Sequence, residues 1–194
     1  MSDPAVSSPQ GRAEDLVDVL IHDHRMIEEL FGELETGDPG ADERRRLANE
    51  VVAELVRHTV AEERYLYPTV RKVLPEGDRV ADHEIHDHNE AERDMKSIEG
   101  LDPTTPDFEF TLTKLMGEMR QHILEEEVEL FPRLRAAADP AELRELARKT
   151  QQVKRLAPTR PHPSAPSRPP ASTLLEPALG LVDRIRDALS RRAT

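Results

Sequence analysis

The sequence has no cysteine and no tryptophan among its 194 residues, and aromatic residues make up only 3% of it. Without cysteine, disulfide bonds, thiolate catalysis and cysteine-based zinc or iron–sulfur sites are excluded, so a bound metal must take nitrogen and oxygen ligands. The scarcity of aromatic residues disfavours a β-sheet core, which usually draws on aromatic and β-branched side chains. The composition therefore predicts an all-α protein.

Two further absences restrict the partners of the chain. No run approaches the roughly 20 apolar residues that a membrane span needs, and the opening MSDPAVSSPQGR contains neither a basic leader nor an apolar stretch. These features predict a cytoplasmic protein without a membrane span. The formal net charge of −12 argues against nucleic acid as a partner, because phosphate binding needs a basic surface.

An internal repeat is the main feature that the sequence does contain. Residues 58–68, HTVAEERYLYP, return as HILEEEVELFP at residues 122–132, a step of 64. The same step carries IHDH at residues 21–24 onto IHDH at residues 85–88. A repeat unit too short to bury its own apolar face predicts two helix pairs packed against each other.

Turn and capping signals divide the chain into five segments. These are a disordered N-terminus, a four-helix bundle, one additional helix, a proline-rich linker and a C-terminal amphipathic helix. Their predicted bounds, in that order, are 1–12, 13–136, 139–156, 157–172 and 173–194. Three partners remain open for the last helix: the bundle, another protein, or a second copy of the chain in self-association.

Histidines and glutamates recur on the apolar stripes of the predicted helices. One histidine lies on the stripe of the first helix, and each of the other three carries a histidine and a glutamate four residues apart, which places both on one face. A buried carboxylate costs several kcal/mol without a partner, so a cation is expected. The candidate metal ligands are His24, His58, Glu62, Glu84, His88, His122 and Glu126, with Glu127 as the alternative to Glu126.

Two of the candidate residues have alternative interpretations. Glu84 has no counterpart in the first half of the repeat, where Leu20 stands 64 residues earlier. It either binds metal or forms a salt bridge at the surface. Tyr65, seven residues after His58, is expected on the same helix face, as a metal ligand, as a donor behind the ligands, or as an aromatic wall of the core.

The number of candidate ligands favours two ions over one. Five to seven nitrogen and oxygen ligands are too many for a tetrahedral zinc ion and fit two ions bridged by carboxylates, as in helix-bundle di-iron and di-manganese proteins. Iron is the favoured metal, as two ions (Fe²⁺/Fe³⁺) with an oxo, hydroxo or carboxylate bridge. Such a centre with an open position can bind or reduce dioxygen, nitric oxide or peroxide.

Three segments resemble the hemerythrin-like family of HHE cation-binding domains: DHRMIEELF at residues 23–31, DHNEAERDM at residues 87–95, and the pattern H-x3-EE-x4-P in both repeats. The resemblance covers about residues 13–135. It implies an antiparallel up-and-down bundle around a non-heme di-iron site, with the candidate ligands other than Glu84 at the family's ligand positions. Oxygen-carrying hemerythrins have two histidines one turn apart on the third helix. Glu84 and His88 stand there instead, which argues against reversible oxygen carriage.

The proline-rich tail resembles the extension of bacterial, particularly actinobacterial, hemerythrin-like proteins. Membership of the family leaves three functions open. The first is a cytoplasmic di-iron protein that binds or senses dioxygen, nitric oxide or peroxide. The second is a catalase-like enzyme that decomposes hydrogen peroxide, suggested by Glu84 and Tyr65 near the centre. The third is an iron-handling or metal-stapled interaction protein, whose C-terminal helix binds a partner.

Overall fold

The computed structural model describes residues 13–37 and 39–156. The predicted N-terminal segment 1–12, the proline-rich linker 157–172 and the C-terminal helix 173–194 lie outside the described residues. Within the described ranges the elements are helices without any strand, which confirms the predicted all-α class. No helix in this part of the chain is both long enough and apolar enough to cross a bilayer.

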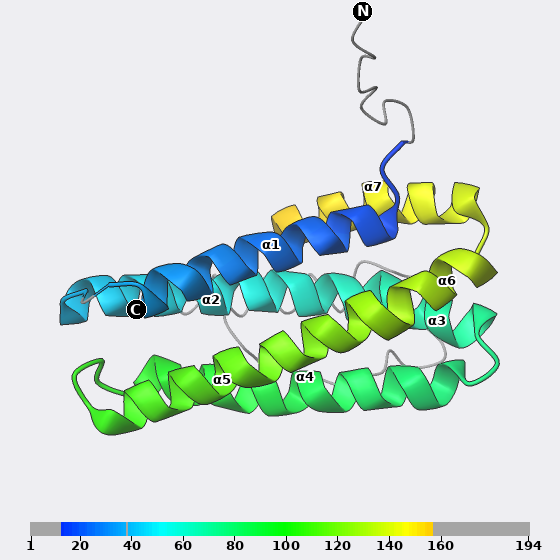
Figure 1. Cartoon of the computed structure of the whole chain (residues 1–194). Coiled ribbons are helices and arrows are strands. Elements are labelled where there is room, and N and C mark those ends of the chain that lie inside the picture. Colours follow the sequence, from blue (N-terminus) through cyan, green and yellow to red (C-terminus); the bar gives the residue numbers. More distant parts are fainter. Residues whose placement is uncertain (1–12, 38, 157–194) are drawn as a thin grey trace, which may run out of the picture.

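Four antiparallel rods form the bundle (Figure 1). The first rod is α1, and the third is α4. The second and fourth rods are each built from three successive elements without an intervening loop. The bounds are α1 Leu16–Glu35; α2 Ala41–Ala61, η1 Glu62–Leu66 and α3 Tyr67–Val73; α4 Gly77–Gly100; and α5 Pro106–Glu125, η2 Glu126–Leu130 and α6 Phe131–Ala137.

A fifth helix, α7 (Pro140–Leu156), packs along α1 and α2 on the outside of the bundle (Figure 1). Its buried side chains include Leu143, Ala147 and Thr150. On the opposite side, the described residues place no further helix over α4 and α5. The two helix pairs of the repeat are therefore covered unequally.

The start of α1 is fixed by side-chain capping. The Asp15 carboxylate accepts a hydrogen bond from the backbone N–H of Asp18, and the Asp18 carboxylate accepts one from the backbone N–H of Asp15. Arg135 on α6 donates to both carboxylates. This contact ties the beginning of the first rod to the end of the fourth.

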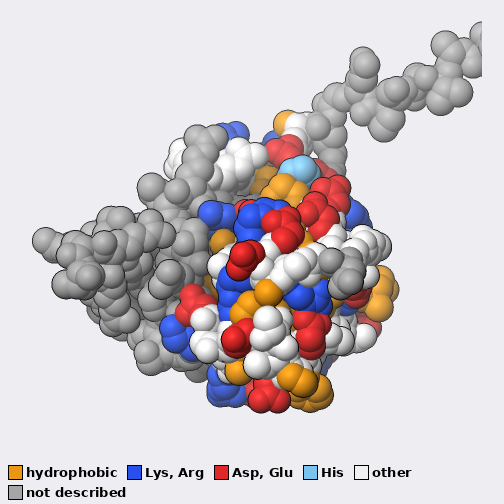
Figure 2. All heavy atoms as spheres, turned by 90° about the vertical axis from the view of Figure 1, so that its left-hand side faces the viewer, with side chains coloured by type: hydrophobic (Ala, Val, Ile, Leu, Met, Phe, Trp, Pro, Cys, Tyr) orange, Lys and Arg blue, Asp and Glu red, His pale blue; other side chains and the backbone are white. Residues whose placement is uncertain are grey.

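The opposite end of the bundle is held by two arginines of α2. Arg44 pairs with Glu109 on α5 and donates to the carbonyl of Leu34 at 3.1 Å. Arg45 donates to the carbonyl of Ile98, at 2.8 Å, and to that of Leu101. These carbonyls belong to helix ends that lack intrahelical donors. Figure 2 shows this end of the molecule, where acidic and basic side chains are interspersed.

Each half of the repeat contains one π-helical turn, and both begin at the glutamate of the repeated motif, Glu62 in η1 and Glu126 in η2. A π-helical turn holds one residue more than an α-helical turn, so the side-chain register shifts beyond it. As a result Tyr67, not Tyr65, is buried on the inner face. Tyr65 is partly exposed beside the Arg64 guanidinium. The expectation that Tyr65 shares the inner face with His58 therefore does not describe the structure.

The apolar core consists of two clusters separated by a polar layer. One cluster, which includes Phe31 and Phe108, fills the half of the bundle next to the α1–α2 and α4–α5 connections. The other, which includes Leu66 and Leu134, fills the half next to α3, α6 and α7. The histidines and glutamates of the candidate site come from the chain segments between these clusters. Water is therefore excluded from the polar layer on both sides.

Candidate metal centre

Four histidines, one from each rod, meet in the polar layer with at most 3% of their surface exposed. They form two pairs through their Nε2 atoms. In one pair, Nε2 of His24 lies 3.2 Å from Nε2 of His58. In the other, Nε2 of His88 lies 3.2 Å from Nε2 of His122. Each pair joins neighbouring helices of one half of the repeat.

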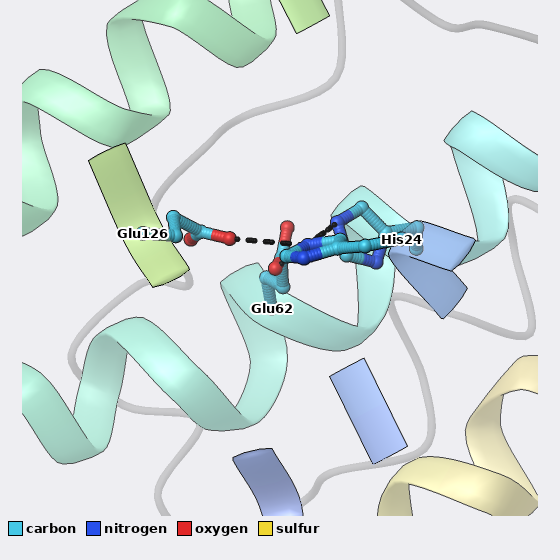
Figure 3. Close-up of side chains that lie close together, drawn as sticks. His24, Glu62 and Glu126 are labelled. Carbon is cyan, nitrogen blue, oxygen red and sulfur yellow. Dashed lines mark hydrogen bonds and ion pairs between the residues drawn. The ribbon is translucent and has the colours of Figure 1, made fainter. Parts of the chain in front are cut away.

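Two buried glutamates connect the two histidine pairs. Figure 3 shows both glutamates, Glu62 and Glu126, beside His24. The Oε1 and Oε2 atoms of Glu62 lie 3.1 Å from Nε2 of His58 and 3.3 Å from Nε2 of His88, respectively. Glu126 has its Oε2 atom 3.4 Å from Nε2 of His24 and its Oε1 atom 3.9 Å from Nε2 of His122. Each carboxylate thus presents one oxygen to each pair.

Every one of these histidines also faces a carboxylate with its other ring nitrogen, Nδ1. A carboxylate at Nδ1 favours the tautomer that carries its proton there and keeps a lone pair on Nε2. The Nδ1 to oxygen distances are 2.8 Å for His24 and Glu127, 3.7 Å for His58 and Asp23, 3.3 Å for His88 and Glu63, and 3.1 Å for His122 and Glu84.

A proton on each Nδ1 atom would leave room for a cation between the Nε2 atoms. With the protons on Nδ1, the Nε2 lone pairs of each histidine pair face each other with no hydrogen between them. Two nitrogen ligands at about 2.1 Å from one ion lie about 3.0 to 3.4 Å apart for octahedral or tetrahedral angles. The observed 3.2 Å separation in both pairs fits one ion per pair.

The carboxylates also lack partners of their own. Both oxygens of Glu62 and Oε2 of Glu126 accept no hydrogen bond within the part of the chain that the structure describes. Burial, together with the charge of Glu126, raises the pKa of Glu62. Burial also acts to raise the pKa of Glu126, but His122 and His24 reverse this and lower it. Burial lowers the pKa of His58 to about 4, which keeps the imidazole neutral. Four imidazoles and two carboxylates therefore fit two divalent cations.

Tyr67 adds a hydroxyl to one side of the centre. Its oxygen lies 3.0 Å from Nε2 of His88, and it donates a hydrogen bond to Oε1 of Glu126 at 3.2 Å. Burial and the charge of Glu126 raise its pKa, so the phenol keeps its proton. The repeat places Phe131 at the equivalent position, where its ring stacks on His24 with a centroid distance of 5.7 Å. The centre is therefore polar on one side and apolar on the other.

A family model described as the hemerythrin HHE cation binding domain matches residues 15–134. The chain belongs to the hemerythrin HHE family. It is 29% identical over 175 residues to an uncharacterized hemerythrin-like protein of Schizosaccharomyces pombe, covering 90% of this chain and 86% of that protein. It is also 32% identical over 120 residues to a DNA nickase of Nostoc sp., but this match covers 61% of the chain and only 33% of that protein.

The fold of this hemerythrin-family chain also matches a solved structure. The crystal structure of a hemerythrin HHE cation binding domain-containing protein from Mycobacterium kansasii superposes with a TM-score of 0.61 at 19% sequence identity. The match covers 89% of this chain and 99% of the other. At this identity the likeness establishes the fold alone, whereas the family model confirms the resemblance seen in the sequence motifs.

The structure brings six of the predicted ligands of this hemerythrin-family site together around the two histidine pairs. The exceptions are three residues. Glu84 lies at Nδ1 of His122, behind that ring. Glu127 lies at Nδ1 of His24, where it also pairs with Arg25 at 2.6 Å. Tyr65 lies away from the inner face.

Tyr67, Glu63 and Asp23 were missed by sequence reasoning, although the alignment of Tyr67 with Phe131 in the repeat was a usable signal. Coordination of metal by the predicted ligands stays a prediction.

Proposed function

We propose that this hemerythrin-family protein holds two iron ions, one at each histidine pair, with Glu62 and Glu126 bridging them, and that it binds or senses dioxygen, nitric oxide or peroxide. The observation that supports this most directly is the placement of both carboxylates, each of which has one oxygen near each histidine pair. Iron bound in this way supplies a redox-active centre for such ligands. A single tetrahedral zinc ion takes four ligands and would leave two of these six residues unused.

The surrounding side chains would support that role in two ways. Hydrogen bonds from Nδ1 of His24 to Glu127 and from Nδ1 of His88 to Glu63 would hold these two imidazoles in the tautomer and orientation that metal binding needs. The apolar clusters on both sides of the polar layer exclude water, which strengthens electrostatic interactions at the centre. The Tyr67 hydroxyl is the hydrogen-bond donor placed to meet a ligand that approaches His88 and Glu126.

Tyr67 also favours a second candidate function, the decomposition of hydrogen peroxide. Its hydroxyl lies 3.0 Å from Nε2 of His88, where it can donate a hydrogen bond to an oxygen atom of peroxide. Peroxide decomposition converts two hydrogen peroxide molecules into two water molecules and one dioxygen molecule, so it needs no external reductant. In that reaction the Tyr67 hydroxyl, which keeps its proton, would donate a hydrogen bond to a peroxide molecule near His88 and Glu126.

Elemental analysis of natively purified protein is the first test. We expect two iron atoms per chain, and a loss of metal in His58→Ala. A chain that contains no transition metal after careful preparation would overturn the proposal. Zinc at one atom per chain would favour the metal-stapled interaction protein instead.

The choice between binding and peroxide decomposition requires a second test. Oxygen evolution from hydrogen peroxide is compared for the wild type, Tyr67→Phe and the matched control Tyr65→Phe. Evolution above that of free iron, reduced only in Tyr67→Phe, supports the enzyme. A reversible spectral change of the reduced protein on mixing with dioxygen, without oxygen evolution, supports the binding protein.

A further inference from the structure

The two halves of the repeat differ in residue type at three equivalent positions, which extend from the surface toward the centre. The step of 64 residues carries Val19, Leu20 and Ala61 onto His83, Glu84 and Glu125. The first three are apolar and buried on the α1–α2 side, along which α7 packs. The last three are ligand-type residues on the α4–α5 side. All three apolar positions of the first half have therefore become potential metal ligands in the second.

His83 and Glu125, at the surface end of these positions, form a compact ligand set with Asp87. The Nε2 atom of His83 lies 3.8 Å from Oδ2 of Asp87 and 3.7 Å from Oε2 of Glu125. The His83, Asp87 and Glu125 side chains are 56%, 34% and 35% exposed, so an ion in solution can reach them. Gln121 donates a hydrogen bond to Oε1 of Glu125 at 2.6 Å, which orients that carboxylate. One imidazole and two carboxylates suit a divalent cation that accepts nitrogen and oxygen ligands.

Asp87 joins this surface set to the interior. It also belongs to a second group, with Glu84 and His122, whose ligand atoms lie within 4.8 Å of one another. Glu84 is 4% exposed, and its Oε2 atom makes no aligned hydrogen bond with a described residue, although it lies 3.1 Å from Nδ1 of His122. A buried carboxylate is thus placed between Asp87 and the centre.

We propose that His83, Asp87 and Glu125 form an outer binding site for a divalent cation, and that the ion passes from there along Asp87 and Glu84 to the buried centre. The route rests on the proposed central metal site, whose histidines and glutamates are too deeply buried to take an ion directly from solution. The partly exposed carboxylate of Glu127 is a poorer point of access, because Arg25 pairs with it and its positive charge repels cations.

The route is tested by the rate of metal loading. Metal-free full-length protein is mixed anaerobically with Co²⁺, and the visible absorbance of the bound ion is followed. The variant His83→Ala/Glu125→Gln is compared with His86→Ala/Glu129→Gln, which removes the same groups at other exposed positions. Because a charged site raises the local cation concentration, we expect loading to slow by about tenfold or more in the first variant only, with unchanged final Co²⁺ per chain. Equal rates in both variants would overturn the route.

The outer site is tested separately, by titrating each metal-loaded protein with Mn²⁺ and measuring the free ion by electron paramagnetic resonance. One additional, weaker Mn²⁺ site is expected in the wild type and in the control variant, and none in His83→Ala/Glu125→Gln. Equal Mn²⁺ binding by all three proteins would overturn the outer site. A wild-type centre that takes up no ion would overturn the proposed function, and the same Mn²⁺ titration of the metal-free proteins would still decide the outer site.

Discussion

Replacing Glu62 by glutamine is expected to stabilise the metal-free protein and to weaken the metal-loaded one. The Glu62 side chain is fully buried, and neither of its oxygens accepts a hydrogen bond from the described residues. Burial and the charge of Glu126 raise its pKa, so the folded state disfavours the charged form. Glutamine keeps the shape of the side chain and removes the charge, and with it one of the two proposed bridging ligands.

The size of the effect follows from the burial. A carboxyl group whose pKa rises on folding destabilises the folded state at every pH above its unfolded pKa of about 4.3. An uncompensated buried charge costs on the order of 3 kcal/mol. For a folded part of this size, that free energy raises the melting temperature of the metal-free variant by about 10 °C.

Bound metal should reverse the order of the melting temperatures of the wild type and Glu62→Gln. Two ions, each at about 100 times its dissociation constant, stabilise the wild type by about 5 kcal/mol. Glutamine lacks the negative charge that bridges the ions, so the variant gains much less. The wild type should therefore melt at a lower temperature than Glu62→Gln in chelator, and at a higher temperature when both proteins are loaded with metal.

Circular dichroism melting curves at pH 7, in chelator and after anaerobic loading with Fe²⁺, measure both states. The exposed Glu129→Gln serves as the control, and its unfolding free energy should change by no more than about 0.5 kcal/mol. A Glu62→Gln protein that melts below the wild type in chelator would refute the reasoning. It would mean that the protein itself neutralises this carboxylate and needs no cation.

Three other predictions concern single side chains. Tyr67→Phe should lower the unfolding free energy of the metal-free protein by about 1 kcal/mol in urea titrations, because the hydrogen bond to Glu126 is lost. The phenylalanine ring should still fit, as Phe131 does at the equivalent position of the other half, and Tyr65→Phe should have no such effect. The pKa of His58 is about 4 in the folded state and about 6.5 in the unfolded state, so its contribution to the unfolding free energy is complete above pH 6.5. About 3 kcal/mol of that free energy is lost as the pH falls to 4. Urea titrations should find a smaller loss in His58→Gln. Gly77→Ala should destabilise the protein by about 2 kcal/mol, because the added Cβ would lie 2.3 Å from the carbonyl oxygen of Val70. Gly117→Ala should instead stabilise the protein by about 1 kcal/mol in the same titrations, because a Cβ added there would meet no atom within 4 Å.

The bundle and the meeting of the inner histidines and glutamates were predictable because their signals are local and occur twice. A histidine and a glutamate four residues apart share a helix face whatever the tertiary structure, and the step of 64 residues matches the two halves. The roles of Glu84 and Glu127 were not predictable in this way. Helical spacing places a side chain on a face but does not say which ring nitrogen of a histidine on a neighbouring helix it will meet.

The choice between Tyr65 and Tyr67 shows a second limit of sequence reasoning. Counting 3.6 residues per turn from His58 places Tyr65 on the inner face, but the π-helical turn at Glu62 adds a residue and brings Tyr67 there instead. Nothing in the local sequence specifies such a turn. The repeat carried indirect information, because Tyr67 aligns with the aromatic Phe131, whereas Tyr65 aligns with Glu129.

Two departures from the repeat, Tyr67 and Glu84, lie beside one histidine pair, which predicts that the two ions of the proposed centre differ in exchange rate. Tyr67 and Glu84 contact His88 and His122, and Asp87 links the latter to the surface. The His24–His58 pair is enclosed by Phe131 and by the side of the bundle along which α7 packs. Release of Co²⁺ to a chelator should therefore occur in two phases of one ion per chain, the faster one slowed by His83→Ala/Glu125→Gln. A single phase that releases both ions would show that the asymmetry of the surrounding residues does not control access.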